Sequence, residues 1–223
     1  MQIWDWTASV NGTQAATRNY GVDDLMARQV DMRMAEMYQM MERALLYNSF
    51  RYVGTATVGR LSGGADYFVY DKNNLSSAAL TLDDIEDALS DKFSAHGMTN
   101  VPNTLWCNAW VKRKISSWGE GTIRTERTES VVGSEIDTLI TNFGTVTVEL
   151  DHLIIPSHVW LLNTDKIQIG PMNGRGFKEI DATIPGTDAT THRGLGEYVF
   201  IFKGEDGAAD GYNCKIYGIS TTT

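Results

Sequence analysis

Histidine is the side chain most often used for acid–base and metal chemistry near neutral pH. The chain contains four, His96, His152, His158 and His192. No two stand three or four residues apart, the spacing at which two histidines on one helix bind a single metal ion. A catalytic group of Asp151-His152 with His158, around Pro156, is conceivable, but general-base catalysis needs a partner within hydrogen-bond distance and a pocket. We therefore interpret the histidines as surface-loop or core residues.

Other motifs of catalytic or ligand-binding type are incomplete. No serine lies in the Gly-x-Ser-x-Gly elbow of hydrolases. Gly59–Gly64 lacks the Gly-Lys-Ser/Thr ending that binds phosphate, and Asp83–Asp87 lacks the central glycine and closing glutamate of a calcium loop. Cys107 and Cys214 are too few for a disulfide scaffold and wrongly spaced for zinc, so we expect small buried side chains. The sequence predicts no enzyme, no catalytic residue, no cofactor and no metal site.

Composition and charge narrow the class of protein. Hydrophobic residues make up 42% of the 223 residues and charged residues 21%, as in globular proteins with one large or two small domains. The formal net charge of −9 repels a polyanion at long range, so we expect no specific nucleic-acid recognition. The apolar runs are shorter than the ~18 residues of a membrane span, and the first residues lack the pattern of a signal peptide. We expect a reducing, cytoplasmic origin and no membrane partner.

The strongest local signal is a long helix from about Asp24 to Tyr47. Asp23 is the expected N-cap, with Asp24 favoured near the positive end of the helix dipole. Apolar residues recur every three or four positions and define one stripe: Met26, Val30, Met34, Met37, Met41 and Leu45. Methionines are concentrated in this segment; we expect them to fill core, and their adaptable thioethers also suit a surface that changes shape. A helix of this length needs a long partner to cover its stripe.

A strand–helix region is predicted downstream. A second helix runs from Leu82 to about Ala95, with Thr81 as N-cap and Gly97 at its end. Its expected buried face consists of Leu82, Ile85, Leu89 and Phe93. Thr104–Cys107 is predicted as a short buried strand, followed by a helix from Ala109 to about Trp118. Three basic residues of this helix are interpreted as a solvated face and not as a phosphate site: Lys112, Arg113 and Lys114.

The first residues and the segment after the long helix are predicted to be extended. Ile3–Thr17 mixes β-forming and polar residues around the turn signal Asn11-Gly12. It has the pattern of one arm of a hairpin, so we expect that a preceding partner strand is missing. Arg51–Tyr70 combines glycines with β-branched and aromatic residues, which predicts short strands and tight turns.

From Ile136 onward the chain is predicted to be rich in β-structure. Apolar Val146, Val148 and Leu150 alternate with polar residues, the period of a half-buried strand. Two further strands are expected at Val159–Leu162 and Lys166–Ile169. We predict a final hairpin of Glu197–Lys203 with Asn213–Ile219 across the turn-rich Gly204–Gly211. Gly174–Gly194, rich in glycine and threonine, is expected to be an exposed loop.

A series of short motifs runs along nearly the whole chain in a fixed order. The segments, in that order, are Val10–Gln14, Glu42–Leu46, Arg60–Gly64 with Tyr67-Phe68, Leu105–Ala109 with Lys112–Ile115, Thr141–Val146, Gly196–Tyr198 and Tyr217–Ile219. In this order they resemble the tailed-phage major capsid proteins with the Hong Kong 97 fold. Val10–Gln14 is similar to the strand leaving the family's extended loop, and Glu42–Leu46 to the end of its spine helix. The specificity lies in the number and order of the motifs.

The resemblance implies an α+β Hong Kong 97-type capsid fold with a long spine helix, a peripheral-domain β-sheet and an axial α/β domain. It implies that residues 1–20 are a remnant of the extended loop and that 21–80 are the peripheral domain with the spine helix. Residues 81–135 then form the axial strand–helix region, and 136–223 a β-rich region completing both domains. Compared with the family, the N-terminal arm and part of the extended loop are missing, which puts assembly of this chain alone in doubt.

The implied function is that of a major capsid protein, which self-assembles into pentamers and hexamers around packaged DNA. Its implied partners are copies of itself, with scaffold, portal and maturation protease, and its implied location is the virion, assembled in the host bacterial cytoplasm. One alternative is an encapsulin-like compartment shell, which shares the fold. Another is a β-rich tail or binding module, in which Trp4, Trp6 and Trp118 would be exposed. A hydrolase that uses His152 and His158 is the third.

Overall fold

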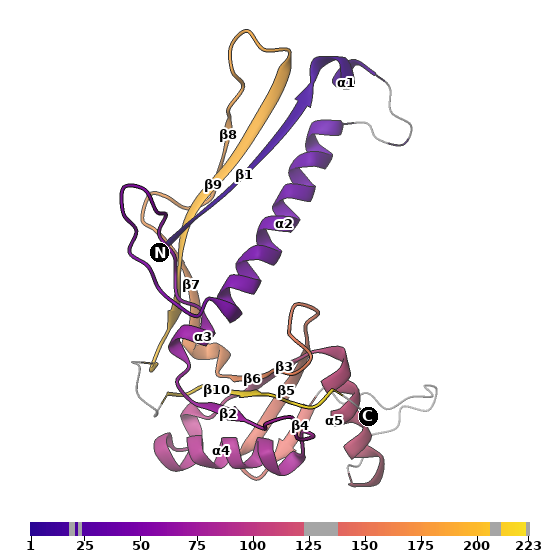
Figure 1. Ribbon diagram of the computed structural model, residues 1–223, viewed down its shortest axis with the longest axis vertical. Coiled ribbons are helices and arrows are strands. Elements are labelled where there is room, and N and C mark those ends of the chain that lie inside the picture. Colours follow the sequence, from indigo (N-terminus) through magenta and orange to yellow (C-terminus); the bar gives the residue numbers. More distant parts are fainter. Residues whose placement is uncertain (18–20, 22–23, 123–137, 206–210, 222–223) are drawn as a thin grey trace. The chain divides into compact units, whose positions relative to one another are not determined.

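The computed structural model describes residues 1–17, 21, 24–122, 138–205 and 211–221 (Figure 1). The chain divides into two compact units, each assembled from separate stretches of sequence. Unit 1 comprises Met1–Tyr67 and Ile169–Ile201, and unit 2 comprises Phe68–Gln168 and Phe202–Thr223. Each unit combines helix with β-sheet, so the predicted α+β class is confirmed. Among the described residues, no helix is long and apolar enough to cross a membrane.

Unit 1 is built from one long helix and an antiparallel sheet. Its elements are β1 (Gln2–Asn11), α1 (Gly12–Ala16), α2 (Leu25–Tyr47), most of α3 (Ala65–Phe68), most of β7 (Ile167–Pro171), β8 (Lys178–Asp181) and nearly all of β9 (Ala189–Phe202). β9 is the central strand, with β1 along one edge and β7 and β8 along the other. In Figure 1, β1 and β9 run side by side and α2 lies along β1.

The N-cap of α2 is Asp24, so the prediction of Asp23 is wrong by one residue. One carboxylate oxygen of Asp24 accepts hydrogen bonds from the backbone amides of Met26 and Ala27, at 2.9 and 3.0 Å. Asp24 has the extended backbone that precedes a first helical turn, which brings its short side chain within reach of those amides. Asp23 lies outside the described residues.

The apolar stripe of α2 is confirmed, and its burial increases toward the C-terminal half of the helix. Met37 and Met41 are buried, and Leu46 beside the stripe is fully buried. The other stripe residues are half-buried: Met26, Val30, Met34 and Leu45. The helix therefore packs most tightly near its C-terminal end.

Two tryptophans of β1 lie opposite two glycines of β9. The register places Trp4 against Gly196 and Trp6 against Gly194. A Cβ atom on Gly194 would lie 2.3 Å from the Trp6 indole, so only glycine leaves room for this ring. Both indoles are buried, which contradicts the exposed positions that a binding module would require of them.

Two loop and strand predictions for unit 1 are wrong. Gly174–Gly194, expected as a loop, contains β8 and the start of β9, which pair antiparallel from Lys178–Leu195 to Asp181–His192. Its threonines, interpreted as loop residues, are β-branched and favour strands. Of the short strands and tight turns predicted for Arg51–Tyr70, the strands do not form. The segment has one isolated bridge between Tyr52 and Leu61 and then α3, because its glycines place turns where strands would need side chains to pack.

Unit 2 is a six-stranded mixed sheet in the order β2-β10-β6-β3-β5-β4. Its elements are β2 (Lys72–Asn74), α4 (Leu82–His96), η1 (Met98–Asn100), β3 (Thr104–Cys107), α5 (Ala109–Thr122), β4 (Thr138–Thr141), β5 (Gly144–Leu150), β6 (Val159–Leu162), η2 (Thr164–Lys166) and β10 (Cys214–Tyr217). β3 runs parallel to β5 and antiparallel to β6. The predicted strand at 104–107 and both predicted helices of this region are confirmed.

The ends of α4 follow the expected capping chemistry. The Thr81 hydroxyl accepts a hydrogen bond from the Asp84 amide at 3.3 Å, and the Asp84 carboxylate accepts one from the Thr81 amide at 2.8 Å. This reciprocal pair is a capping box, and Gly97 ends the helix with φ of +69°. Of the predicted buried face, Ile85 and Leu89 are buried, whereas Leu82 and Phe93 are 37% and 38% exposed.

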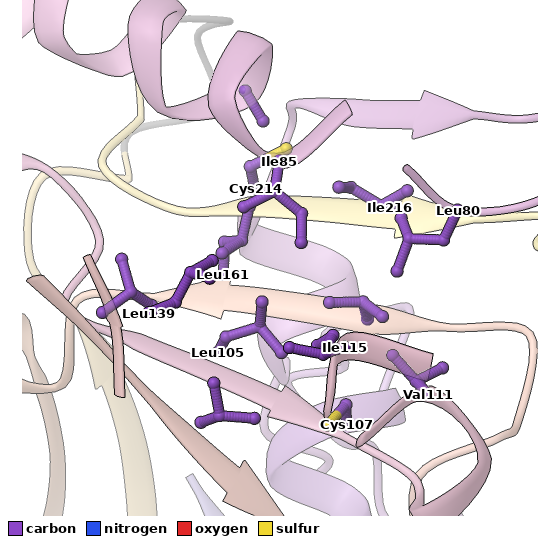
Figure 2. Packing of buried hydrophobic residues seen from close by; sticks show 14 of the residues in the cluster. Leu80, Ile85, Leu105, Cys107, Val111, Ile115, Leu139, Leu161, Cys214 and Ile216 are labelled. Carbon is purple, nitrogen blue, oxygen red and sulfur yellow. The ribbon is translucent and has the colours of Figure 1, made fainter. Parts of the chain in front are cut away.

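An aliphatic core fills the space between the sheet of unit 2 and its two helices (Figure 2). Leu105 and Cys107 of β3 lie two residues apart and therefore face the same side of the sheet. Residues from α4, α5 and neighbouring strands complete the cluster: Ile85, Leu89, Val111, Ile115, Val146, Val148, Leu161 and Ile216. These residues are nearly inaccessible to solvent, so unit 2 has a dense core of its own.

The predicted final hairpin does not form. β9 pairs with β1 over ten residues in the sheet of unit 1, whereas β10 pairs with β6 and β2 in the sheet of unit 2. Adjacent strands joined by a turn-rich segment usually pair with each other, but here each strand pairs with strands from elsewhere in the sequence. Residues 206–210 of the connection lie outside the described residues.

Candidate assembly surfaces

The four histidines, considered above as catalytic or metal-binding groups, make packing and hydrogen-bond contacts or lie in solvent. His192 contacts Glu179 on the neighbouring strand β8 (Nδ1 to Oε1, 2.7 Å). The His152 side chain is 74% exposed, 3.7 Å from its neighbour Asp151. His158 and His96 pack edge-on against the rings of Tyr217 and Tyr212 respectively. No group of three or more His, Cys, Asp or Glu within the described residues is arranged to hold a metal ion.

Both cysteines are buried and free, as expected for small core residues. Burial raises the pKa of the Cys107 thiol to about 12, against the weak opposing effect of Lys112. Burial, with help from the neighbouring Asp71, also raises the pKa of Cys214 to about 12. Because the thiolate is the reactive form, both thiols stay neutral and unreactive at physiological pH.

The glycine-containing segment at 59–64 holds the end of α2 and forms no phosphate loop. The Gly64 amide donates to the carbonyl of Asn48, the C-cap of α2, and the Asn48 side chain donates to the carbonyl of Ser62 at 2.8 Å. A Cβ atom on Gly64 would lie 2.3 Å from the carbonyl oxygen of Ala44. The glycine is therefore needed for a close backbone contact with the last turn of the helix.

Exposed apolar residues extend the surface of α2 beyond its buried stripe. Met32, Tyr38 and Met40 are 48%, 59% and 52% exposed. Exposed apolar side chains favour contact with another protein surface, because removing apolar surface from water lowers the free energy. α2 thus offers apolar surface both to its own sheet and to solvent.

An open apolar groove of about 370 Å³ lies between α2 and the sheet of unit 1. One wall comes from α2 and the other from the sheet and the segment before β8: Met37, Tyr38, Met41, Glu42 and Leu45, then Ile169, Phe177 and Tyr198. The Phe177 amide donates to the Tyr198 hydroxyl at 3.2 Å, which fixes the second wall. A groove with one carboxylate and otherwise apolar or aromatic residues suits an apolar side chain from another surface.

Sequence reasoning identified the α2 side of this groove and missed the other side. Phe177 lies in the segment expected as a loop, and polar Lys178 and Glu179 interrupt the alternation that would have indicated β8. Ile169 lies at the end of a predicted strand, but nothing in the sequence places it opposite α2. The groove depends on pairing between distant segments, which local patterns do not report.

A buried carboxylate in unit 1 anchors two exposed arginines. Glu197 on β9 is buried, with Oε1 2.5 Å from Arg175 Nε and Oε2 3.9 Å from Arg60 Nη1. Both arginine side chains are 53% exposed, so their guanidinium groups reach solvent. A buried carboxylate needs such partners, so this cluster holds the turn at 174–176 and the segment at Arg60 against the sheet.

The chain matches a family profile over most of its length. The profile of the SU10 major capsid protein family covers residues 1–209 of the 223. Comparison with curated proteins gives no significant sequence match.

Solved structures share the fold at low sequence identity. A chain of the cyanophage A-1(L) capsid asymmetric unit superposes with a TM-score of 0.70 at 12% identity, covering 98% of this chain and 77% of that one. A structure of Mycobacterium phage Adephagia gives 0.60 at 10% identity, covering 100% and 73%. The holo-SrpI encapsulin complex from Synechococcus elongatus gives 0.64 at 9% identity, covering 99% and 75%.

These similarities confirm the expected Hong Kong 97-type fold. Encapsulin shares this fold, so the fold alone does not separate a phage capsid from a compartment shell. The family profile does separate them. On this combination of fold and family, the chain belongs to the SU10 major capsid protein family and is a structural subunit of a phage capsid.

Proposed function

We propose that this chain assembles with copies of itself into pentamers and hexamers that close into an icosahedral shell around packaged DNA. The observation that carries the proposal is the apolar surface of α2 and the adjoining groove, exposed in the single chain. Rings need heterologous contacts, in which one surface of each copy meets a different surface of the next. A groove on one side and exposed apolar side chains elsewhere on the same unit are suited to such contacts.

The charge of the chain is compatible with enclosing DNA. A formal net charge of −9 disfavours long-range attraction to phosphate. DNA can then move along the shell without the salt-sensitive, sequence-independent adhesion that lysine- and arginine-rich surfaces produce. We therefore assign the chain no specific nucleic-acid recognition.

In this proposal each stretch of the chain corresponds to one region of the capsid fold. Residues 1–20 belong to the extended loop and 21–80 to the peripheral domain with α2 as its spine helix. Residues 81–135 form the axial strand–helix region, and 136–223 complete both domains. The role is purely structural, with no catalytic, cofactor or metal site. Scaffold, portal and maturation protease are the further partners, and assembly takes place in the host bacterial cytoplasm.

Assembly of a double variant, Tyr38→Ser with Met40→Ser, tests the proposal. Central apolar residues of an interface commonly contribute about 2 kcal/mol each, and about 1.4 kcal/mol corresponds to a factor of ten in affinity. Sedimentation velocity of protein made from the complete reading frame should therefore show at least roughly tenfold weaker assembly. Gln39→Ser, a polar change between the two positions on the same helix, is the control and should assemble normally. Assembly of the double variant at the concentration of the unaltered protein would argue against α2 as an assembly surface.

A further inference from the structure

Glu205, which follows β9 in unit 2, is a buried carboxyl in a network of polar side chains. Its Oε1 accepts hydrogen bonds from the backbone amide and the side-chain Nδ2 of Asn213, at 2.7 and 2.9 Å. Asn213 Oδ1 accepts one from the amide of Asn163, just after β6, at 2.6 Å. Asn163 Nδ2 donates to the carbonyl of Val101 at 3.2 Å. One hydrogen-bonded series thus joins both described ends of the β9–β10 connection to β6 and to the segment before β3.

Within the part of the chain that the structure describes, two acceptors of this network have no donor. Glu205 Oε2 and Asn163 Oδ1 are both buried and have no hydrogen-bond partner among the residues that the structure describes. An ionised carboxylate can only accept hydrogen bonds, whereas a protonated one supplies a donor. A buried acceptor without a donor destabilises the folded state. Protonation of the Glu205 carboxyl therefore adds one hydrogen-bond donor and removes one unpaired acceptor site from the network.

Among the described residues, the charged groups around Glu205 do not supply it with a counter-ion of its own. Lys92 of α4 is buried, and its Nζ lies 2.8 Å from Asp71 Oδ2, so its charge is shared between two carboxyl groups. His96 of α4 packs edge-on against Tyr212, and Lys166 of η2 lies over the same ring, 5.9 Å from its centroid. Beside Asp71, the Cys214 thiol stays neutral because burial raises its pKa to about 12.

Two glycines make close contacts at the described ends of the β9–β10 connection. A Cβ atom on Gly211 would lie 1.8 Å from Glu205 Oε2, so no other residue leaves room for this oxygen. Gly204 has φ of +82°, and a Cβ there would lie 1.9 Å from the ring of Tyr212. The backbone at Gly211 therefore closes directly onto the carboxyl group, and the backbone at Gly204 closes onto the ring of Tyr212.

We propose that Glu205 is a proton-operated latch of unit 2. In the neutral form it fastens Gly204–Glu205 and Gly211–Asn213 to β6 and to the segment before β3. In the ionised form a buried negative charge shares the cation of Lys92 with Asp71, and the contact loosens. The latch gives the subunit a response to pH that goes beyond its role as a shell component.

The direction of the pH response follows from burial. Burial raises the pKa of Glu205 from its ordinary value of 4.5 to about 7, although the hydrogen bonds from Asn213, the charge of Lys92 and the backbone amide of Tyr212 act in the opposite direction. The folded state therefore binds the proton more tightly than the unfolded chain does. The stabilisation is fully present below about pH 4.5 and is lost as the pH rises through about 7.

Urea unfolding of the full chain between about pH 5 and pH 8 tests the latch through the variant Glu205→Gln. The measured quantity is the unfolding equilibrium constant of the unaltered protein divided by that of the variant. This ratio should rise by roughly tenfold per pH unit from about pH 5 and level off above about pH 7. Glu149→Gln, a change of an exposed glutamate on β5, is the matched control and should keep the unaltered pH dependence. Identical pH profiles for the unaltered protein and Glu205→Gln would overturn the proposal.

Infrared spectroscopy provides a second readout that does not depend on unfolding. At about pH 6, exposed glutamates are ionised and a protonated Glu205 should give a carboxylic-acid carbonyl band. This band should vanish in Glu205→Gln and persist in Glu149→Gln. A spectrum of the unaltered protein without any such band would show that Glu205 is ionised and that no latch exists. Both measurements use the isolated chain, so their failure would leave the shell proposal untouched.

Discussion

Unit 2 contains nine of the twelve largest fully buried side chains among the described residues, and unit 1 contains three. Those of unit 2 are Leu80, Ile85, Leu89, Leu105, Ile115, Ile154, Trp160, Leu161 and Leu162, and those of unit 1 are Met37, Leu46 and Phe200. Unit 1 instead exposes many large apolar groups, among them Ile3, Met32, Tyr38, Met40, Val53, Ile180 and Ile184. Unit 2 thus has a self-sufficient core, whereas unit 1 carries apolar surface that copies of the chain are suited to cover.

The two units also differ in where they place charge. In unit 1 the ion pairs Asp5–Arg193 and Arg33–Glu36 lie on the surface, where pairs stabilise a fold only weakly. In unit 2 Lys92 is buried against Asp71, close to the buried Glu205. Unit 1 also has one buried carboxylate, Glu197, but its arginine partners are half exposed, whereas in unit 2 the cation Lys92 is itself buried. The comparison teaches that unit 2 encloses a charged pair in its interior, while unit 1 leaves the cationic partners of its charged groups open to solvent.

The largest effect is expected in the core of unit 2. Leu161→Ala on β6 removes a fully buried side chain and should lower the free energy of unfolding by about 2–5 kcal/mol, from lost burial and the cavity left behind. Leu150→Ala on β5, where the leucine is 54% exposed, should change it by less than about 0.5 kcal/mol. Urea denaturation measures both. Equal losses would mean that the core is not concentrated where we place it.

A smaller loss is expected at the end of α2. Gly64→Ala places a Cβ 2.3 Å from the Ala44 carbonyl oxygen and 2.7 Å from that of Leu45, and the backbone must shift to accept it. Overpacking of this kind costs roughly 1–3 kcal/mol in the free energy of unfolding. Gly59→Ala meets nothing within 4 Å and serves as the control. A neutral Gly64→Ala would show that this segment does not hold the helix.

The start of α2 should be less sensitive still. Asp24→Ala removes the carboxylate that accepts from two amides of the first turn, which should cost about 1 kcal/mol in the free energy of unfolding. Asp24→Ser, which retains a capping oxygen, should recover most of the loss. Asp31→Ala, the same change at an exposed position inside the helix, should not destabilise the protein. Thermal or urea unfolding measures these losses. A larger loss of stability in Asp31→Ala than in Asp24→Ala would contradict the capping role.

The smallest effect is expected on the exposed side of α2. Met32→Ala should change the free energy of unfolding of the subunit by less than about 0.5 kcal/mol, because half of this side chain is already in solvent. Urea denaturation at subunit concentrations too low for assembly measures this value. A loss above about 1 kcal/mol would indicate that Met32 packs inside the subunit and is not free for neighbours.

Elements that depend on local signals could be predicted from the sequence. The period of α2, the Thr81 cap and Gly97 stop of α4, and the buried strand Thr104–Cys107 all appear where their own residues indicate. In each case the signal lies within a few residues of the element it specifies, since periodicity and capping are local properties. The one-residue error at Asp23 shows the limit of locating a helix end among consecutive acidic residues.

Pairing between distant segments could not be predicted in the same way. The turn-rich Gly204–Gly211 indicated a hairpin, yet β9 and β10 belong to different sheets. β9 pairs with β1, and β10 pairs with β6. These distant pairings decide the sheet to which each strand belongs, and no local pattern records them. The groove residues Phe177 and Tyr198 were missed for the same reason. The resemblance to capsid proteins recovered the overall fold because it uses the order of many weak motifs together.

The central claim is that copies of this chain close into a shell, with α2 of each copy covered by a neighbour. Cryo-electron microscopy of the protein produced from its complete reading frame tests this most directly. We predict closed icosahedral particles in which every subunit contains the α2–sheet unit and the six-stranded unit, with density from an adjacent copy over Met32, Tyr38 and Met40. Particles in which these three side chains face only solvent, or a preparation of single subunits at every concentration, would contradict the account.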